Sequence, residues 1–192
     1  MLRASTSEPS PTGRPRSSAT RTAILGAALD LVATIGYRET TIEGIAKHAG
    51  AGKQTIYRWW PSKADVVLEA LNENAAREIP LPDEGNLRAD LEAFLAATFA
   101  AGRRPGVISV LRALMAEAQL DARFAKVFDQ NFLRHRRDVL AQLLRRYPEQ
   151  CRADSGTLAV DVVFGVLWYR ALVGHRNLDH ALAHSLVELL AW

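Results

Sequence analysis

The chain has 192 residues, of which 48% are hydrophobic and 23% are charged, a composition typical of a globular protein. No apolar run approaches the roughly 18 residues that a membrane-spanning helix needs, and residues 1–20 lack the apolar stretch of a secretory signal, so we expect no membrane segment. The single cysteine, Cys151, excludes a framework of internal disulfides and fits the reducing cytoplasm, where we expect the protein to act.

Positive charge is concentrated toward the N-terminus. Residues 1–63 contain 9 Lys+Arg and 4 Asp+Glu, a balance of +5, whereas residues 64–192 contain 15 and 17, a balance of −2. This asymmetry is typical of a nucleic-acid-binding region joined to a nearly neutral body.

The first structured element is predicted to begin at Arg21. Residues 1–20 are rich in Ser, Pro and Arg and contain too few apolar residues to form a core, so we expect a disordered basic arm. From Arg21 onward, apolar residues recur every three or four positions as far as Ile35, and Gly36 then ends the predicted helix.

Two short helices joined by a glycine turn are predicted next. Thr40 and Glu43 form a capping-box pattern with Thr40 as the cap. The helix that they open ends at a glycine, and a second one follows over residues 53–60, directly before a proline that stops it. Ser62 then caps a fourth helix.

The remaining elements are also predicted to be helices. Residues 79–82 contain two prolines and predict a hinge, and neither strand patterns nor internal repeats are found. We therefore expect an all-α protein of about nine helices, with one domain over residues 21–68 and a larger one over residues 80–192. The larger domain is predicted to contain helices at residues 86–102, 106–118, 121–147, 157–174 and 178–191.

Residues 41–60 have the form of a helix-turn-helix motif, whose second helix enters the major groove of DNA. Ile56 and Trp60 lie four positions apart and should anchor that second helix to the two helices before it. Polar side chains on its other face are then free to meet DNA. The outward-facing residues are predicted to be Gln54, Thr55, Tyr57 and Arg58.

The outward-facing side chains suit both bases and phosphates. Gln54 matches adenine edges, Arg58 matches guanine, and the methyl group of Thr55 can contact a thymine methyl. Basic and hydroxyl groups at the ends of the helix suit phosphates, which position a protein without reading sequence. We expect such phosphate contacts from Lys53, Tyr57 and Lys63.

Residues 40–46, TTIEGIA, and residues 49–63, AGAGKQTIYRWWPSK, resemble the DNA-binding domain of the TetR family of transcriptional regulators. The resemblance extends over about residues 21–68, roughly a quarter of the chain. The sequence departs from the family pattern at Gly44, where Ala is more usual, and at Trp59, where many members have His. The resemblance implies DNA contacts by Thr41, Lys53, Gln54, Thr55, Tyr57, Trp59 and Lys63.

The resemblance also implies the role of the C-terminal domain. In the family this domain is helical, and its last two helices form a four-helix bundle with those of a second subunit. Here those helices are residues 157–174 and 178–191, so a homodimer on a palindromic operator is implied. Residues 132–137 followed by 159–170 are similar to one C-terminal type that is widespread in actinobacterial TetR regulators.

Three arginines before the motif are further candidates for DNA contact. The segment Gly13-Arg14-Pro15-Arg16 resembles an AT-hook, in which arginines enter a narrow minor groove, and the alternative is a flexible basic tail. Arg21, at the start of the first predicted helix, is the third candidate.

Aromatic residues and methionine recur on shared helix faces of the larger domain. Such side chains adapt to irregular ligands and suit the wall of an apolar cavity, although an ordinary core has the same pattern. We therefore expect a small-molecule ligand that is apolar or aromatic. The candidate pocket residues are Phe94, Thr98, Leu111, Met115, Phe128, Phe132, His135, Phe164 and Trp168.

A histidine pair near the C-terminus is the strongest metal-like pattern. His180, His184 and Glu188 lie four positions apart, but the His-Glu-x-x-His pattern of a helical zinc site is missing. We therefore expect neither a metal nor another cofactor.

A run of arginines at residues 134, 136 and 137 is interpreted as a solvated face, with Asp129 and Asp138 near enough to pair with it. A second DNA contact at this run is not favoured, because the sensing domain normally lies away from the duplex.

No glycine-rich phosphate loop, nucleophile elbow or Cys/His cluster is found, so we do not expect an enzyme. The function predicted is that of a homodimeric, sequence-specific DNA-binding protein, a repressor that a ligand releases from its operator. Three alternatives stay open: an activator, a constitutive DNA binder with a filled pocket, and an enzyme or adaptor that retains a vestigial head.

Overall fold

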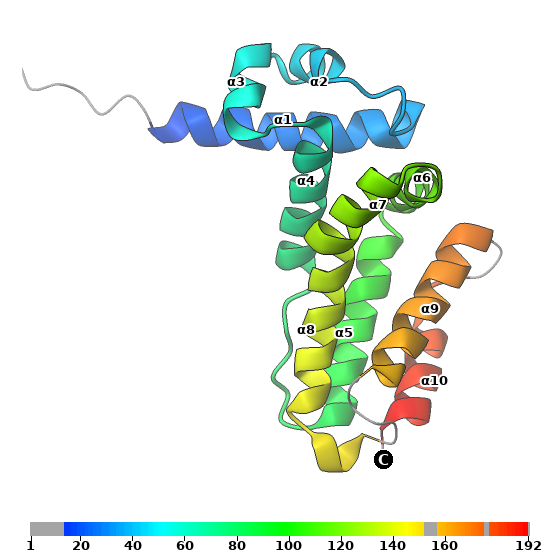
Figure 1. Ribbon diagram of the computed structural model, residues 1–192. Coiled ribbons are helices and arrows are strands. Elements are labelled where there is room, and N and C mark those ends of the chain that lie inside the picture. Colours follow the sequence, from blue (N-terminus) through cyan, green and yellow to red (C-terminus); the bar gives the residue numbers. More distant parts are fainter. Residues whose placement is uncertain (1–13, 152–156, 175–176, 192) are drawn as a thin grey trace, which may run out of the picture.

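The computed structural model describes residues 14–151, 157–174 and 177–191, and within these residues it is helical throughout, with no strand (Figure 1). The segments α7, η1 and α8 follow one another without a break and form the helix that was predicted over residues 121–147. Counting that run once gives nine α-helices in the described residues, as predicted. The elements are α1 (Arg14–Ile35), α2 (Ile42–Ala49), α3 (Lys53–Trp59), α4 (Lys63–Glu78), α5 (Leu87–Gly102), α6 (Val107–Leu120), α7 (Ala122–Phe128), the π-helical η1 (Asp129–Leu133), α8 (Arg134–Arg145), the 3-10 turn η2 (Pro148–Gln150), α9 (Leu158–Val173) and α10 (His180–Leu190).

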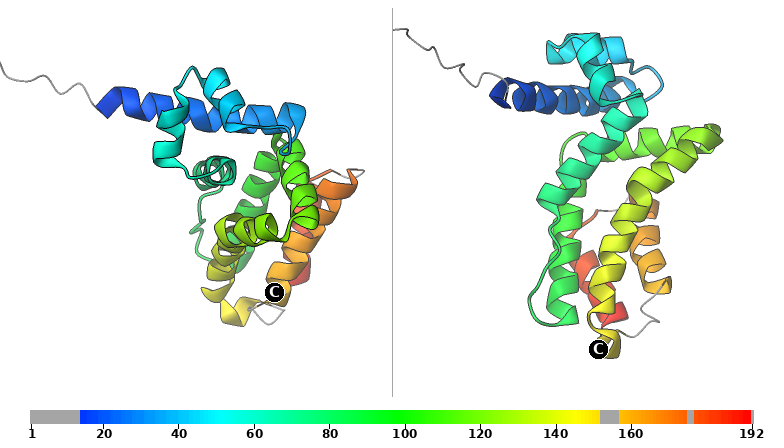
Figure 2. Two further views of the ribbon diagram at one scale, coloured as in Figure 1. Left: turned by 45° about the horizontal axis from the view of Figure 1, so that its top comes forward. Right: turned by 60° about the vertical axis from the view of Figure 1, so that its left-hand side comes forward.

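Helix α1 lies across one end of the molecule, with α2 and α3 on its outer side (Figure 1). Helix α4 leads away from them and runs toward the other helices, as the right-hand view of Figure 2 also shows. Helices α5 and α8 pack against each other, and α9 and α10 pack beside them. We call α1–α3 the head and α5–α10 the body, with α4 joining the two.

The N-terminal end of α1 differs from the prediction. The helix begins at Arg14, so the expectation of disorder was wrong for residues 14–20, whereas residues 1–13 and the side chains of Arg14 and Arg16 lie outside the described part of the chain. Pro15 explains the early start, because proline is favoured in the first turn of a helix, where its missing N–H leaves no bond unmade.

One stretch of α1, Ser18–Ile35, is long and apolar enough to cross a membrane by length and composition alone. Its Ile24, Ala28 and Val32 are buried, and α1 packs on α2, α4 and α6. We therefore interpret this stretch as the core helix of the head.

The cap of α2 lies one residue later than predicted. Thr41 is the N-cap, and its hydroxyl oxygen accepts a hydrogen bond from Gly44 N at 3.0 Å, whereas the buried Thr40 hydroxyl donates to Gly36 O at 2.8 Å. A Cβ atom on Gly44 would lie 3.3 Å from the Thr41 hydroxyl oxygen and 3.6 Å from Leu31 Cδ1. An alanine methyl at this departure from the family pattern would therefore lie in close contact with the capping hydroxyl.

Two apolar clusters form the interior of the described residues. One lies within the body and is built from α5, α8, α9 and α10. The other joins the head and α4 to α6 and the aromatic residues of α7, and the half-buried Trp168 of α9 packs against both. Because the second cluster runs from head to body, the head is packed onto α6 and α7 through a shared core.

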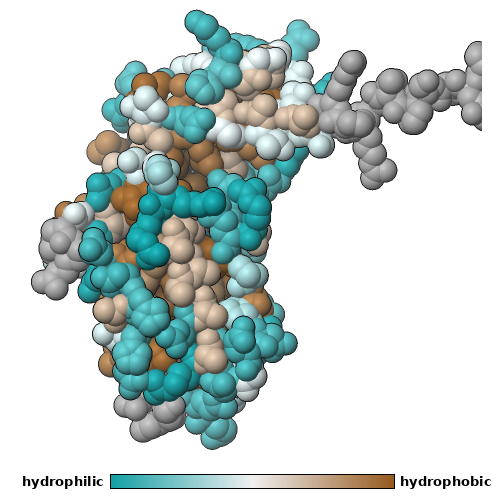
Figure 3. Space-filling model, turned by 180° about the vertical axis from the view of Figure 1, so that it is seen from behind, coloured by the Kyte–Doolittle hydropathy of each residue, from teal (hydrophilic) through white to brown (hydrophobic). Residues whose placement is uncertain are grey.

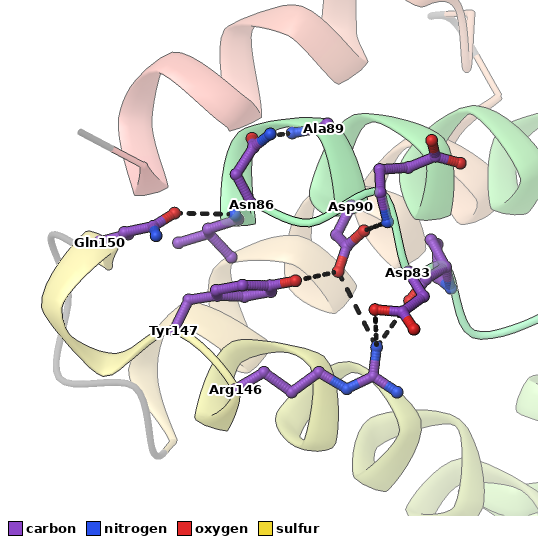
Figure 4. A network of polar contacts seen from close by, with 10 residues as sticks. Asp83, Asn86, Ala89, Asp90, Arg146, Tyr147 and Gln150 are labelled. Atoms are coloured by element: carbon purple, nitrogen blue, oxygen red, sulfur yellow. Dashed lines mark hydrogen bonds and ion pairs between the residues drawn. The ribbon is translucent and has the colours of Figure 1, made fainter.

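The end of the body far from the head is held by a polar network around Asp90 (Figure 4). One oxygen of this fully buried carboxylate accepts from the Tyr147 hydroxyl at 3.0 Å, and Arg146 Nη1 lies 3.9 Å from the same oxygen. The other oxygen accepts from Glu84 N at 2.5 Å, and Leu87 N donates to Gln150 Oε1 at 2.9 Å. These bonds join the start of α5 to the end of α8, so the two helices are held together at the end of the body far from the head.

Candidate DNA-binding surface and ligand cavity

Helix α3 presents a polar outer face, as the sequence predicted. Ile56 and Trp60 are buried beneath it, and the Trp60 indole nitrogen donates to Glu69 Oε2 of α4 at 2.7 Å. Figure 1 shows α3 and α2 on the side of α1 that faces away from the body, where none of the described helices covers them. The exposed side chains of α3 are Lys53, Gln54, Tyr57 and Arg58, while Thr55 and Trp59 are half-buried.

The two charged side chains of α3, Lys53 and Arg58, lie over aromatic rings, and Lys53 also pairs with a carboxylate. Lys53 Nζ lies 5.7 Å from the Tyr57 ring centroid and pairs with Glu43 of α2; this hydrogen bond raises the pKa of Lys53 and lowers that of Glu43. Because the pair is fully exposed, a DNA phosphate can replace the carboxylate at little cost. The Arg58 guanidinium lies 5.4 Å from the Trp59 ring.

The Trp59 ring is part of the packing of the head. It meets the buried Trp60 ring edge to face at a centroid distance of 5.5 Å. A large aromatic ring in place of the more usual His therefore supports Arg58 from below, and a direct DNA contact by Trp59 stays a prediction.

Lys63 has a different role from the one predicted. Its ammonium nitrogen donates to three carbonyl oxygens, Tyr37 O at 2.8 Å, Arg38 O at 3.1 Å and Thr40 O at 2.9 Å, and it lies 4.4 Å from the Tyr37 ring centroid. Burial lowers the pKa of Lys63. Since an ammonium has three N–H donors, none remains for a phosphate. We therefore correct the predicted phosphate contact: Lys63 fastens the α1–α2 turn to the start of α4.

Arg21 is also engaged inside the protein. It forms ion pairs with Glu69 and Glu73 of α4, and its guanidinium lies 5.9 Å from the Trp60 ring centroid. These contacts join α1 to α4 and give Arg21 a structural role, while the DNA contact by Arg21 stays a prediction. The sequence pattern did not reveal the structural role, because the partners lie about fifty residues away along the chain.

A cavity of about 780 Å³ lies between the head and the body. Head helix α1 and connecting helix α4 supply part of its wall, and α5, α6, η1, α8 and α9 supply the rest. A volume of this size suits a drug-sized organic molecule. Seen from behind, hydrophobic surface is visible where the head meets the body, bordered by hydrophilic residues (Figure 3).

Six of the nine predicted pocket residues line this cavity. Phe94 and Phe128 do not; both are fully buried in the packed interior, where Phe128 stacks on neighbouring rings of α7 and η1. His135 is exposed at the surface of α8. The residues that do line the cavity are Thr98, Leu111, Met115, Phe132, Phe164 and Trp168.

The arginine run of α8 is only partly the solvated face that we expected. Arg134 pairs with Asp129 at 2.7 Å, as predicted, but Arg137 pairs with Asp161 of α9 and not with Asp138. Arg136 is 6% exposed and lines the cavity. Its spacing of four from Phe132 on one side and from Leu140 on the other could have placed it on the apolar face of the helix.

The two histidines of α10 each lie near a different carboxylate. His180 Nε2 lies 3.2 Å from Glu92 Oε1, and His184 Nε2 lies 3.9 Å from Glu188 Oε1. In the described part of the chain, no group of three His, Cys, Asp or Glu side chains is placed to hold a metal ion.

Comparisons with known proteins identify both parts of the chain. The family described as "Bacterial regulatory proteins, tetR family" matches residues 24–70, and the family described as "Tetracyclin repressor-like, C-terminal domain" matches residues 81–190. The uncharacterized HTH-type transcriptional regulator YdeS of Bacillus subtilis is 30% identical over 180 residues, which cover 91% of this chain and 89% of YdeS.

Solved structures agree with these matches. The crystal structure of a TetR family transcription regulator is 32% identical, with a TM-score of 0.72, and the match covers 88% of this chain and 94% of that one. The regulator FadR of Bacillus subtilis, solved in complex with stearoyl-CoA, shares the fold at a TM-score of 0.71 and 20% identity, over 87% of this chain and 95% of FadR. The helix-turn-helix head, the helical body and these matches together show that the chain belongs to the TetR family of DNA-binding transcriptional regulators.

Proposed function

We propose that the protein is a homodimeric repressor that a small-molecule ligand releases from its operator DNA. The observation that supports this proposal is the composition of the cavity wall. Leu29, Asp30 and Ala33 of α1 line the cavity together with Leu71 and Ala75 of α4, and body helices complete it. A ligand in the cavity therefore touches α1 and α4, on which the recognition helix is packed, as well as α9, one of the two helices expected to dimerise.

Release by a ligand requires two states that differ in the position of the heads. In a dimer, the two recognition helices must lie about 34–36 Å apart to enter successive major grooves of an operator. Because α4 joins each head to its body, a molecule that displaces α4 changes this separation. The ligand releases the DNA only if it binds the state with the wrong head separation more tightly than the state whose heads fit the operator.

Gly106 lies close to α1 at the cavity. It has a φ of +82°, and a Cβ atom on it would lie 3.2 Å from Ala33 Cβ. Both the positive φ and the close approach favour glycine here. Since Gly106 and Ala33 both line the cavity, a ligand acts directly at the contact between body and head.

Exposed apolar residues on α9 and α10 support a dimer through these helices. Tyr169 is 58% exposed and Leu189 is 57% exposed. A single exposed apolar side chain is ordinary, but several of them on the last two helices indicate a contact with another molecule. Trp192, the last residue of the sequence, lies outside the described residues. The exposed large apolar residues of α9 and α10 are Leu158, Tyr169, Leu172, Val173 and Leu189.

Replacing Leu172 and Leu189 together with glutamate is expected to convert the dimer into a monomer. An unpaired charge in an apolar interface costs roughly 3 kcal/mol or more, which raises the dissociation constant at least about a hundredfold. Light scattering at micromolar concentration measures the mass directly. Ile35→Glu, at an exposed apolar residue of the head, is the control and should remain a dimer. A wild-type protein with the mass of one chain would contradict the proposed dimer.

Gln54→Ala and Arg58→Ala are expected to weaken operator binding selectively. Both side chains are exposed on α3 and have the forked geometry that suits base edges. Each substitution should cost about 1–3 kcal/mol on the operator and much less on random DNA. Gel shifts against the DNA upstream of the protein's own gene, with random DNA as competitor, measure both losses. Equal losses of affinity on the two DNAs would show that these residues contact phosphates and do not read bases.

The same gel shifts test release by a ligand. Compounds that bind the isolated protein, detected as a rise in melting temperature, are added to the operator complex. A repressor of the proposed kind loses DNA at the ligand concentrations that raise the melting temperature. Retention of DNA by every such compound would instead identify a constitutive binder.

A further inference from the structure

We propose that the cavity takes an organic monocarboxylate, whose single carboxylate is held by the guanidinium of Arg136 while its apolar part fills the remaining space. This inference rests on the proposed ligand-binding role of the cavity and names the chemical class of the ligand. It also changes the expectation from the sequence, which was an apolar or aromatic molecule without a required charge.

Arg136 is a buried charge without a counter-charge. The side chain is 6% exposed, its Nη2 atom is inaccessible to solvent, and that atom has no hydrogen-bond partner. Its neighbour on the inside is the Phe94 ring, whose centroid lies 5.9 Å from the guanidinium carbon. Burial lowers the pKa of the guanidinium, but arginine stays protonated in proteins. An unpaired buried charge is costly, so a group that is absent from the protein chain should complete this site.

The other charged residues of the cavity wall already have partners. Arg137 pairs with Asp161, and Arg104 pairs with Glu78. Asp129 pairs with Arg134 at the surface of α8, and Asp30 Oδ2 lies 3.8 Å from His48 Nε2 in the head. Among the lining residues that the structure describes, Arg136 is thus the cation for which no carboxylate partner is found.

A second unpaired polar group lies in the same cavity. The Thr98 hydroxyl of α5 is buried and has no hydrogen-bond partner. Helices α5 and α8 pack against each other, so Thr98 and Arg136 both belong to the wall that these two helices form. A hydroxyl can donate to a carboxylate oxygen that also accepts from a guanidinium. Two side chains of one cavity wall that each have a polar atom without a partner favour an acidic oxygen ligand.

The charge balance favours a carboxylate over a phosphate. One uncompensated positive charge is neutralised by one negative charge, whereas a phosphate monoester carries about −1.5 to −2 at neutral pH and would leave a surplus charge buried. The planar guanidinium also matches the two oxygens of a carboxylate in a bidentate pair. The rest of the wall is suited to an apolar body, with Leu111, Met115, Phe132, Phe164 and Trp168 among its residues.

The test compares three probes that differ only in the head group: decanoate, 1-decanol and decyl phosphate. Calorimetric titration of the full-length protein, without DNA, measures each affinity. We expect decanoate to bind at least about tenfold more tightly than decanol, since a charge-assisted pair in a desolvated site is stronger than a neutral hydrogen bond. Decyl phosphate should also bind more weakly than decanoate. Equal binding of decanoate and decanol, or a preference for decyl phosphate, would overturn the proposal.

Arg136→Met removes the charge and keeps a side chain of similar length. We expect this variant to bind decanoate about 10–100-fold more weakly, to bind decanol within about threefold of wild type, and to melt no lower than wild type, because it replaces an unpaired buried charge with an apolar group. Arg145→Met, at an exposed arginine of the same helix, is the charge-matched control and should change neither affinity. Thr98→Val should weaken decanoate binding a few-fold.

A structural role for Arg136 predicts the opposite pattern. In that case Arg136→Met lowers the melting temperature, while the folded fraction of the variant binds decanoate with the affinity of the wild type. Arg136→Lys then serves as the second variant, since it retains the charge and should retain part of the preference for decanoate over decanol. Loss of stability without loss of that preference would overturn the proposal.

Binding and DNA release are measured separately, so that the two proposals can fail independently. Decanoate binding that depends on Arg136 supports the site even if the operator complex survives, and survival counts against ligand-triggered release. Release by neutral compounds that bind independently of Arg136 supports the repressor function and overturns the carboxylate site.

Discussion

Phe128→Ala is expected to lower the stability of the folded protein by about 3–5 kcal/mol, the cost of removing an aromatic side chain from a packed core. Phe128 is 1% exposed and lies between the rings of Phe124 and Phe132, at centroid distances of 5.9 and 5.7 Å. It also meets the Trp168 ring edge to face at 6.4 Å. For a chain of this length the melting temperature should fall by about 6–20 °C.

Trp168→Ala is the matched variant and should cost only about 1–2 kcal/mol. Trp168 is the neighbour of Phe128, but it is half-buried and lines the cavity, so truncation enlarges a space that already exists. DNA binding without ligand should be retained, while binding of a cavity ligand is weakened. Thermal melting and gel shifts on both variants check this difference.

Equal destabilisation by the two substitutions would contradict the cavity assignment. If Trp168→Ala lost as much stability as Phe128→Ala, together with DNA binding, Trp168 would be a core residue. The cavity would then be smaller than 780 Å³ in solution or placed elsewhere. The pair therefore tests the position of the cavity before any ligand is known.

Lys63→Met is expected to destabilise the head by about 2–3 kcal/mol, because the charge-assisted bonds to three carbonyls are lost. The loss is not larger because the side chain is only half-buried. The three carbonyls precede α2, so the helix-turn-helix should loosen at its start. Because Lys63 has no donor left for DNA, the slope of log affinity against log salt should not change.

Lys53→Ala should give the reverse result. Lys53 is exposed at the start of α3, and its paired Glu43 is exposed as well, so the ammonium can exchange the carboxylate for a phosphate. Losing one phosphate contact per subunit should flatten the salt slope by about 0.9 per contact, with little change in melting temperature. A flattened slope for Lys63→Met with unchanged stability would restore the original prediction of a phosphate contact.

Local patterns in the sequence predicted most helix bounds to within one or two residues. Gly36 and Gly50 have positive φ values of 86° and 62° and end α1 and α2 as expected, and Ser62 and Asp65 form the predicted capping box of α4. These features depend on residues within one helical turn. The early start of α1 and the shift of the α2 cap were missed because a proline in the first turn, and two adjacent threonines, allow more than one local solution.

The sequence by itself determined the all-α fold, the helix-turn-helix and its outward face, and the family, because helix periodicity, caps and a contiguous motif are local properties. Only the tertiary structure decided what the charged side chains do. Lys63 reaches carbonyls 23 to 26 residues away, Arg21 meets α4 about fifty residues away, and Arg136 is buried against α5. The role of a charged side chain depends on the groups that lie around it in space. On one face of a helix an arginine is solvated, and on the opposite face the same residue is an unpaired buried charge.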